Sequence, residues 1–379
     1  MAGKNKKPWR FHSKKAVVIT VCMVVILLLI LVLVYDGGTM KPLKDDQGNA
    51  IASSISEKIF VEINGTRLGM FIRSTNKDNP VLLFMHGGPG MPEYFLEEKY
   101  PTGLDSVFTV CWLEQRGAGL SYYPGMPAEE ITVDQLVSDG IAVSSYLCNR
   151  FGKEKIYLMG HSWGSLIGVK MAGKAPGLYN AYIGIAQISD QYQSEVLAFD
   201  YMLDTYRREG NTRMAEKLEM YSPYMSQKKF EHYFVSGFRD TVMHDLGVGT
   251  MHAMHSVFSG IFIPVMTSNA YTLKEKINIW KAKSFLAKST SLRKEMFGSK
   301  LPEQIKVLEI PTYFLSGVYD YTVSAILAKQ FLSGITAPIK GFYTFDNSAH
   351  SPLFEESEKF VNIMLEDVLT GENNLSDKE

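Results

Sequence analysis

From Pro80 onward, short apolar runs alternate with segments of helical periodicity, and this alternation is the strongest constraint on the fold. A run that is apolar throughout indicates a strand buried on both faces, and helices between such strands indicate parallel pairing. We therefore predict an α/β fold with a mostly parallel sheet and helices on both of its faces. The runs span residues 81–86, 107–113, 155–160, 181–187, 312–317 and 341–345, and the helical segments span 132–150, 165–174, 322–333 and 353–369.

The alternation stops between residues 190 and 309, which are rich in Met, Tyr, Phe and His and mostly helix-like. This interval predicts an inserted helical cap that divides the core into residues 57–189 and 310–370, with 371–379 as a tail. Ahead of the core, "KIFVEI" and "RLGMFI" flank Asn64-Gly65-Thr66, and Asn-Gly between alternating apolar runs predicts an antiparallel hairpin. The same triplet fits a glycosylation sequon, but the turn explains it without a sugar.

The amino end has a different composition, because residues 16–34 form a 19-residue stretch without a charge. As a helix this stretch would be about 28 Å long, close to the thickness of the hydrocarbon core of a bilayer. It predicts one transmembrane anchor, so that the lipid bilayer is a partner of the chain. The alternatives are a cleaved signal peptide, which the following "LVYDGGTM" does not favour, and a buried core helix.

Six basic residues and no acidic residue precede this stretch: Lys4, Lys6, Lys7, Arg10, Lys14 and Lys15. The positive-inside rule then predicts a cytoplasmic tail over residues 1–15, a single-pass protein of the cell membrane and an extracytoplasmic catalytic domain. Residues 35–56 are polar and small, and they read as a linker.

Charge and cysteine content narrow the possible partners. The net charge is −1 and no basic stripe is interleaved with aromatic residues, so we expect no nucleic-acid partner. Cys22 lies in the apolar stretch, and Cys111 and Cys148 are expected to be buried thiols rather than a disulfide framework. "MHAMH" (251–255) puts two histidines on one face of an expected helix, which is too few ligands for a metal site. We expect no cofactor and no metal, and the sequence assigns no oligomeric state.

The segment Gly160-His161-Ser162-Trp163-Gly164 matches G-x-S-x-G between a strand and a helix, which is the context of a nucleophile elbow. Side chains at 160 and 164 would clash in so sharp a turn. The turn exposes Ser162 above the sheet edge, beside the amino end of a helix that favours a developing negative charge. His161 is expected to point away from the serine.

A serine hydroxyl needs a base to act as a nucleophile, and His350 in "DNSAHSP" follows the last strand. Asp320 in "SGVYDYTV" follows the strand at 312–317 and is expected to orient the histidine. The chain order Ser162, Asp320, His350 is that of α/β-hydrolases. The alternative acid is Asp346, which we expect to form a salt bridge or a cap instead.

"HGGPG" at residues 86–90 follows a strand, and its bare glycines allow backbone N–H groups to approach an oxyanion. We predict that the two donors are the N–H groups of Gly88 and Trp163. The alternative is an ordinary Gly-Pro turn.

"HGGPG", "WLEQRGAGLS", "GHSWGS", "GVYDYTV" and "SAHSP" together resemble the proline iminopeptidase branch of the α/β-hydrolase superfamily, over roughly residues 57–370. The cap matches least. The resemblance implies the α/β-hydrolase fold, with Ser162, Asp320 and His350 as the triad and Gly88 and Trp163 as the oxyanion hole. It also implies that Arg116 is structural and holds the loop after its strand.

Prolyl aminopeptidases of this branch hold the free amine of the substrate with glutamates of the cap. Here "QISDQYQSEVLAFDYMLD" offers Asp190, Glu195, Asp200 and Asp204. We choose Glu195 as the substrate-binding residue because it lies soon after the strand at 181–187, although a solvated helix face would also explain these acids.

We therefore expect a membrane-anchored serine hydrolase that forms an acyl-enzyme and acts on small peptides as an aminopeptidase of the proline iminopeptidase type. The alternative is a carboxylesterase or lipase-like hydrolase of small esters or amides. A third hypothesis, a catalytically dead binding module, is opposed by the complete set of triad and oxyanion residues.

Overall fold

The protein is described by a computed structural model, which covers residues 10–35, 37–45, 47–224 and 226–378. Its core is one eight-stranded sheet in the order β1-β2-β4-β3-β5-β6-β7-β8. The strands are β1 (Ile55–Ile63), β2 (Thr66–Ser74), β3 (Val81–Met85), β4 (Thr109–Glu114), β5 (Ile156–His161), β6 (Tyr179–Ile185), β7 (Thr312–Gly317) and β8 (Lys340–Phe345). All pairs from β4 to β8 are parallel, whereas β2 is antiparallel to both β1 and β4. The predicted mostly parallel sheet is confirmed.

The predicted hairpin is also confirmed, since β1 and β2 pair in register up to Ile63 opposite Thr66. The two residues between them, Asn64 and Gly65, have φ angles of 47° and 73°. Positive φ at both central positions is the requirement of the tight turn that Asn-Gly favours. The side-chain amide of Asn64 donates to Asp139 Oδ1 at 2.9 Å.

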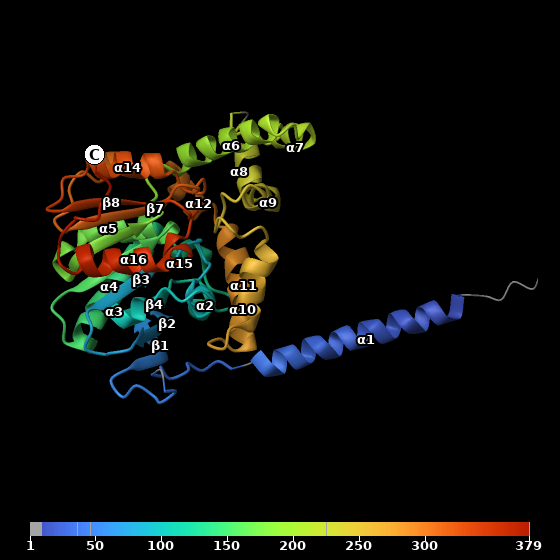
Figure 1. Cartoon of the computed structure of the whole chain (residues 1–379), viewed down its shortest axis with the longest axis horizontal. Coiled ribbons are helices and arrows are strands. Elements are labelled where there is room, and N and C mark those ends of the chain that lie inside the picture. Colours follow the sequence, from blue (N-terminus) through green and yellow to red (C-terminus); the bar gives the residue numbers. More distant parts are fainter. Residues whose placement is uncertain (1–9, 36, 46, 225, 379) are drawn as a thin grey trace, which may run out of the picture.

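Two hydrophobic clusters lie on opposite faces of the sheet, as the alternation of side chains along each strand requires. Leu83 belongs to the first cluster with residues of α4 and α5, while its neighbour Leu82 belongs to the second with residues of α16. Helices therefore cover both faces, as predicted (Figure 1). The core helices are α2 (Tyr94–Lys99), α3 (Leu104–Val107), α4 (Val133–Phe151), α5 (Trp163–Lys174), α14 (Ala325–Gly334), α15 (Pro352–Glu355) and α16 (Ser357–Ile363).

Eight α-helices and one short π-helix (Phe258–Phe262) are described between β6 and β7, and they form a layer beside the sheet, at the right of the domain in Figure 1. We call residues 190–309 the cap. Its own hydrophobic cluster includes Phe199, Met202 and Tyr233. Its helices are α6 (Gln191–Arg208), α7 (Thr212–Glu219), α8 (Gln227–Val235), α9 (Gly237–Asp245), α10 (Ile263–Thr267), α11 (Leu273–Ala287), α12 (Thr290–Gly298) and α13 (Leu301–Gln304).

Two expected helical segments differ from the structure. Residues 251–255 form turns, so His252 and His255 do not share a helix face. The ring of His252 instead stacks on Tyr319 with centroids 3.8 Å apart. Residues 353–369 are not one helix, because α15 ends at Glu355 before α16 begins. Periodicity alone does not reveal such a break.

Helix α1 (Arg10–Tyr35) contains the apolar stretch expected as an anchor. Among the residues that the structure describes, no helix is both long and apolar enough to cross a bilayer. The side chains of residues 28, 29 and 31–34 lie outside that description, as do residues 1–9 of the expected cytoplasmic tail.

The segment after α1, expected as a polar linker, packs against the domain. A Cβ added to Gly37 would lie 2.5 Å from the backbone oxygen of Asn269, and one added to Gly38 would meet the side chain of Thr272. Leu43 is buried, and its backbone oxygen accepts a hydrogen bond from the N–H of Ile51. The segment therefore lies against the start of α11 as well as the core.

Candidate active site

Ser162 lies at the corner between β5 and α5, with φ 53° and ψ −120°. This is a left-handed conformation that residues other than glycine rarely adopt. The neighbouring glycines are sterically required: a Cβ on Gly160 would lie 2.5 Å from the oxygen of Gly164, and one on Gly164 would lie 2.0 Å from the oxygen of Met85. The strained turn expected from the sequence is present.

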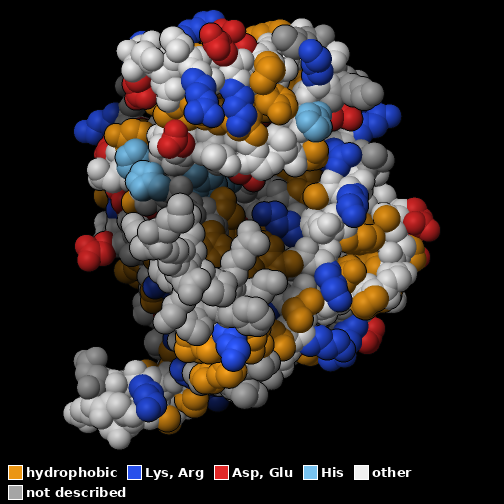
Figure 2. Space-filling model, turned by 90° about the vertical axis from the view of Figure 1, so that its right-hand side faces the viewer, with side chains coloured by type: hydrophobic (Ala, Val, Ile, Leu, Met, Phe, Trp, Pro, Cys, Tyr) orange, Lys and Arg blue, Asp and Glu red, His pale blue; other side chains and the backbone are white. Residues whose placement is uncertain are grey.

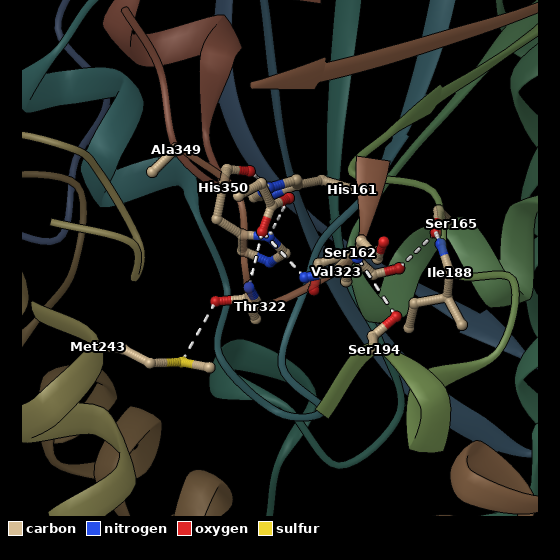
Figure 3. A network of polar contacts seen from close by, with 12 residues as sticks. His161, Ser162, Ser165, Ile188, Ser194, Met243, Thr322, Val323, Ala349 and His350 are labelled. Atoms are coloured by element: carbon tan, nitrogen blue, oxygen red, sulfur yellow. Dashed lines mark hydrogen bonds and ion pairs between the residues drawn. The ribbon is translucent and has the colours of Figure 1, made fainter. Parts of the chain in front are cut away.

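His350 and Asp320 come together from two different loops, which follow β8 and β7. Figure 3 shows His350 close to His161 and to Thr322. Nδ1 of His350 lies 2.9 Å from Oδ2 of Asp320. The other carboxylate oxygen accepts hydrogen bonds from the N–H groups of Thr322 and Val323, each at 2.9 Å. With Asp320 as acceptor, Nδ1 carries the proton and Nε2 is left free to accept one.

The alternative acid, Asp346, lies elsewhere. Its side chain is 77% exposed, and its nearest charged partner is Lys359 at 3.9 Å. A surface ion pair of this kind is the role that the sequence suggested for it. Asp320, by contrast, is fully buried against the histidine.

Ser162 and His350 line the same cavity. Within the described residues, no hydrogen bond joins the serine hydroxyl to the imidazole ring. Such bonds are often long in enzymes without substrate and tighten when the substrate is bound.

The two N–H groups expected to stabilise an oxyanion belong to Gly88 and Trp163. Neither has a hydrogen-bond acceptor in the described part of the chain. The N–H of Gly87, in contrast, donates to Oε1 of Glu93 at 2.7 Å and is not available. Gly88 has φ 116°, and both Gly88 and Ser162 line the cavity. The N–H of Trp163 belongs to the first residue of α5, where the helix dipole favours negative charge.

His161 was expected to point away from the serine, but it lines the same cavity as Ser162. Its partner is Glu93, which the sequence did not single out. Nδ1 of His161 lies 2.8 Å from Oε2 of Glu93, and Nε2 lies 2.8 Å from the backbone oxygen of His350. Burial alone would raise the pKa of Glu93 and lower that of His161, but their mutual attraction and hydrogen bonds reverse both directions. Both shifts favour an ionised Glu93 and an imidazolium at His161, whose two ring nitrogens each face an acceptor.

The cleft above Ser162 has two lobes that share the serine and Gly88. We call the first, of about 190 Å³, the histidine lobe, because His161, His244 and His350 line it. The second, of about 290 Å³, is the cap lobe, because most of its lining comes from α8, α9, α11 and α12. Figure 2 views the cap side of the molecule and shows a hollow with hydrophobic and basic side chains around it.

Glu195 does not occupy the position expected from the sequence, because it lines neither lobe. Its carboxylate is fully buried and paired with Arg239, whose Nε lies 2.7 Å from Oε2. Arg239 itself lines both lobes. Glu195 therefore contacts Arg239 and not the cavity.

Among the lining residues that the cap contributes, the acid is Asp240, which follows Arg239 in the sequence and lines both lobes. Its side chain is 48% exposed, and Oδ1 accepts from Arg239 at 3.0 Å. No sequence signal separated Asp240 from the other acids of the cap, because the selection depends on how α9 packs over the serine.

Arg116 has the structural position that the resemblance implied. Its guanidinium makes two hydrogen bonds to Asp139 of α4, at 2.7 and 3.0 Å, and donates to the backbone oxygen of Asn64. It thereby joins the loop after β4 to the hairpin turn. Cys111 and Cys148 are buried free thiols, as expected, and within the described residues no cluster of three or more potential ligands could hold a metal ion.

Comparison with known proteins identifies the family and agrees with the fold. The family model for the alpha/beta hydrolase fold matches residues 80–357. A probable aminopeptidase, YbaC of Bacillus subtilis, is 29% identical over 308 residues, which are 80% of this chain and 93% of that protein. Proline iminopeptidase of Thermoplasma volcanium is 30% identical over 115 residues, 30% of this chain and 37% of its own.

Solved structures show the same fold at lower sequence identity. Proline iminopeptidase of Mycobacterium smegmatis superposes with a TM-score of 0.59 at 14% identity, covering 81% of this chain and 96% of its own. An epoxide hydrolase mutant of Bacillus megaterium gives 0.50 at 19% identity, with 81% and 98% covered. The resemblance to the proline iminopeptidase branch is confirmed, and the chain belongs to the alpha/beta hydrolase fold family.

Proposed function

We propose that this protein is a serine hydrolase that removes amino-terminal residues from small peptides through an acyl-enzyme on Ser162. The observation that carries the proposal is the hydrogen bond between His350 and Asp320 at the cleft that Ser162 lines. The ring is held in the tautomer whose free nitrogen can take the serine proton.

In the first half of the reaction, Oγ of Ser162 attacks the scissile carbonyl carbon while Nε2 of His350 takes the hydroxyl proton. The carbonyl oxygen becomes an oxyanion, for which the N–H groups of Gly88 and Trp163 are the available donors. When the tetrahedral intermediate collapses, the C–N bond breaks and the imidazolium gives its proton to the leaving amine. Each oxyanion donor contributes about 3 kcal/mol to such a step.

In the second half, a water molecule takes the place of the amine. His350 accepts one proton of this water while the water oxygen attacks the acyl carbon. The ester bond to Ser162 then breaks. The proton returns to the serine oxygen, and the carboxylic acid product leaves.

Aminopeptidase activity requires a group that holds the free ammonium of the substrate. We propose Asp240 for this role, because it lines both lobes, is half exposed, and has one oxygen without a described partner. Substitution Asp240→Asn should raise KM for peptides with a free amine more than for uncharged esters. Equal effects on both substrates would exclude this role.

A second candidate is an esterase of small apolar acyl groups. The observation that favours it is the wall of the cap lobe, where Phe234, Leu286 and Met296 lie beside Ser162. The name of the Bacillus subtilis relative favours the aminopeptidase, and we place that activity first.

The deciding experiment compares proline p-nitroanilide and other unblocked aminoacyl anilides with p-nitrophenyl acetate and butyrate. Release of nitroaniline from a substrate with a free amine, abolished by Ser162→Ala, is expected. Ester turnover without cleavage of any unblocked anilide would reject the aminopeptidase in favour of the esterase. Failure of a fluorophosphonate probe to label Ser162 would reject both.

We further propose that residues 16–34 anchor the enzyme in the cell membrane, with the amino end in the cytoplasm and the catalytic domain outside. The support is the 19-residue uncharged stretch and the six basic residues before it. The full chain should remain in membranes after alkaline carbonate extraction, whereas a chain beginning at Gly37 should not. Release of the full chain by carbonate would reject the anchor.

A further inference from the structure

Two of the basic side chains that line the cap lobe form no ion pair with a described carboxylate. Three basic residues line it, namely Arg239, Lys283 and Arg293. Arg239 is paired with both Glu195 and Asp240. Within the described residues, neither Lys283 nor Arg293 forms an ion pair. Lys283 and Arg293 therefore face the cleft without a carboxylate in contact. Counted with Arg239 and its two carboxylates, the group keeps one net positive charge, which attracts an anionic group of a ligand.

The helices that carry these cations turn them toward the same space. Lys283, Leu286 and Ala287 lie on one face of α11, at spacings of three and four residues, and all line the lobe. Arg293 lies on α12 beside the lining residues Leu292 and Met296.

Two buried polar atoms of the lobe lack partners. Nε of Arg293 is buried without an acceptor, and Oε1 of Gln191 is buried without a donor. Gln191 is only 3% exposed, and its amide nitrogen donates to the backbone oxygen of Thr322 at 2.9 Å and to Glu195. Its orientation is thus fixed, and its oxygen remains as an acceptor. A buried polar group without a partner is costly, so a ligand that pairs with it gains affinity.

We infer that the cap lobe binds the carboxylate of a short peptide substrate, with Lys283 and Arg293 as its cationic partners and Gln191 as the acceptor of a peptide N–H. The inference rests on the proposed peptidase function. Beyond that function, we infer that the leaving group of the substrate, the part released as an amine, ends in a free carboxylate close to the scissile bond. The substrates are then di- and tripeptides rather than long chains, which fits a lobe of about 290 Å³.

A carboxylate can come from the chain terminus or from an acidic side chain, and three dipeptides distinguish them. We would measure kcat/KM for Pro-Ala, Pro-Ala-amide and Pro-Glu-amide at constant ionic strength. We expect Pro-Ala to be preferred over Pro-Ala-amide by about tenfold, as for a hydrogen-bonded charged contact. A preference confined to Pro-Glu-amide would overturn the terminal assignment.

The variant Lys283→Gln should reduce the preference for Pro-Ala over its amide to within about twofold, and Arg293→Gln should reduce it in the same direction. The matched control is Lys281→Gln, because Lys281 is exposed on α11 and lines neither lobe. It should keep the wild-type preference. An unchanged ratio in Lys283→Gln, or no preference in the wild type, would overturn the inference.

A second readout separates this inference from the proposed function. The same dipeptides are tested as inhibitors of p-nitrophenyl acetate hydrolysis, which needs no peptide cleavage. If no peptide is cleaved, the aminopeptidase proposal fails. Stronger inhibition by Pro-Ala than by its amide, lost in Lys283→Gln, would still support the carboxylate site, and equal inhibition by both would reject it.

Discussion

Nε2 of His161 lies 2.8 Å from the backbone oxygen of His350, so the residue before the nucleophile holds the loop of the base. Its other nitrogen contacts Glu93, which also accepts the N–H of Gly87. One buried ion pair therefore connects the nucleophile elbow, the oxyanion loop and the histidine loop.

Removing both members of this pair should cost less than the two single losses added together. His161→Asn leaves a buried carboxylate unpaired, for which we expect a loss of about 3–5 kcal/mol in the free energy of unfolding. The double variant His161→Asn, Glu93→Gln should lose less than the sum of the single variants. Urea denaturation of all three measures this, and strict additivity would show that the two groups do not interact.

The stability that the His161–Glu93 pair contributes should depend on pH, in the sense given by the direction of the pKa shift of His161. Because the pKa of His161 is raised in the folded state, its contribution is fully present below its ordinary value of 6.5 and is lost as pH rises through the raised value. The destabilisation by Glu93→Gln should therefore be smaller at strongly alkaline pH than at pH 7. The same unfolding measurement at the two pH values tests it.

Ser162→Ala should lower turnover by about 10⁴-fold or more without unfolding the domain. Ser162→Gly removes the same hydroxyl but also relieves the positive φ, a strain of about 1–3 kcal/mol. We expect the glycine variant to have a melting temperature at or above that of the alanine variant, despite the greater flexibility of glycine in the unfolded chain. A markedly lower value for glycine would indicate that the turn is not strained.

Asp320→Asn should reduce kcat by about 10⁴-fold, because an amide does not fix the histidine tautomer as a carboxylate does. Asp346→Asn is the matched control, since that side chain lies on the surface four residues before the histidine. It should leave kcat within about twofold, as for surface substitutions. Comparable losses in both variants would contradict the assignment of the acid.

Ionisation of the buried carboxyl group of Glu114 should lower the free energy of unfolding as pH rises. Burial raises the pKa of Glu114 from an ordinary 4.5 to about 8, while its oxygens accept from Tyr271 and from the N–H of Leu120, each at 2.5 Å. Its contribution is complete below pH 4.5 and is lost as pH rises through about 8.

Glu114→Gln can keep both contacts without a titrating proton. We expect the variant to lack this part of the pH dependence, so that its stability relative to the wild type improves on going from pH 5 to pH 9. The difference is on the order of 4 kcal/mol at most. Parallel stability profiles of the two proteins would contradict the raised pKa.

The core was predictable because its signals are local. Buried strands such as β7 are apolar throughout, and the elbow requires glycine at 160 and 164 for steric reasons that hold in any context. The pairing of Asp320 with His350 followed from their positions after two neighbouring strands.

The cap was less predictable because its contacts depend on packing between helices. Glu195 and Asp240 are both acids of the cap, but only the packing of α9 against α6 decides which one is buried and which one reaches the cleft. In the same way, nothing in the sequence pairs Glu93 with His161, 68 positions away.

Gly37 and Gly38 pack tightly on Asn269 and Thr272, at the start of the helix that carries Lys283. A side chain at either position would collide with these residues, so only glycine allows the segment after α1 to lie this close to the amino end of α11. A substitution at Gly37 or Gly38 would therefore disturb the base of a helix that lines the cleft.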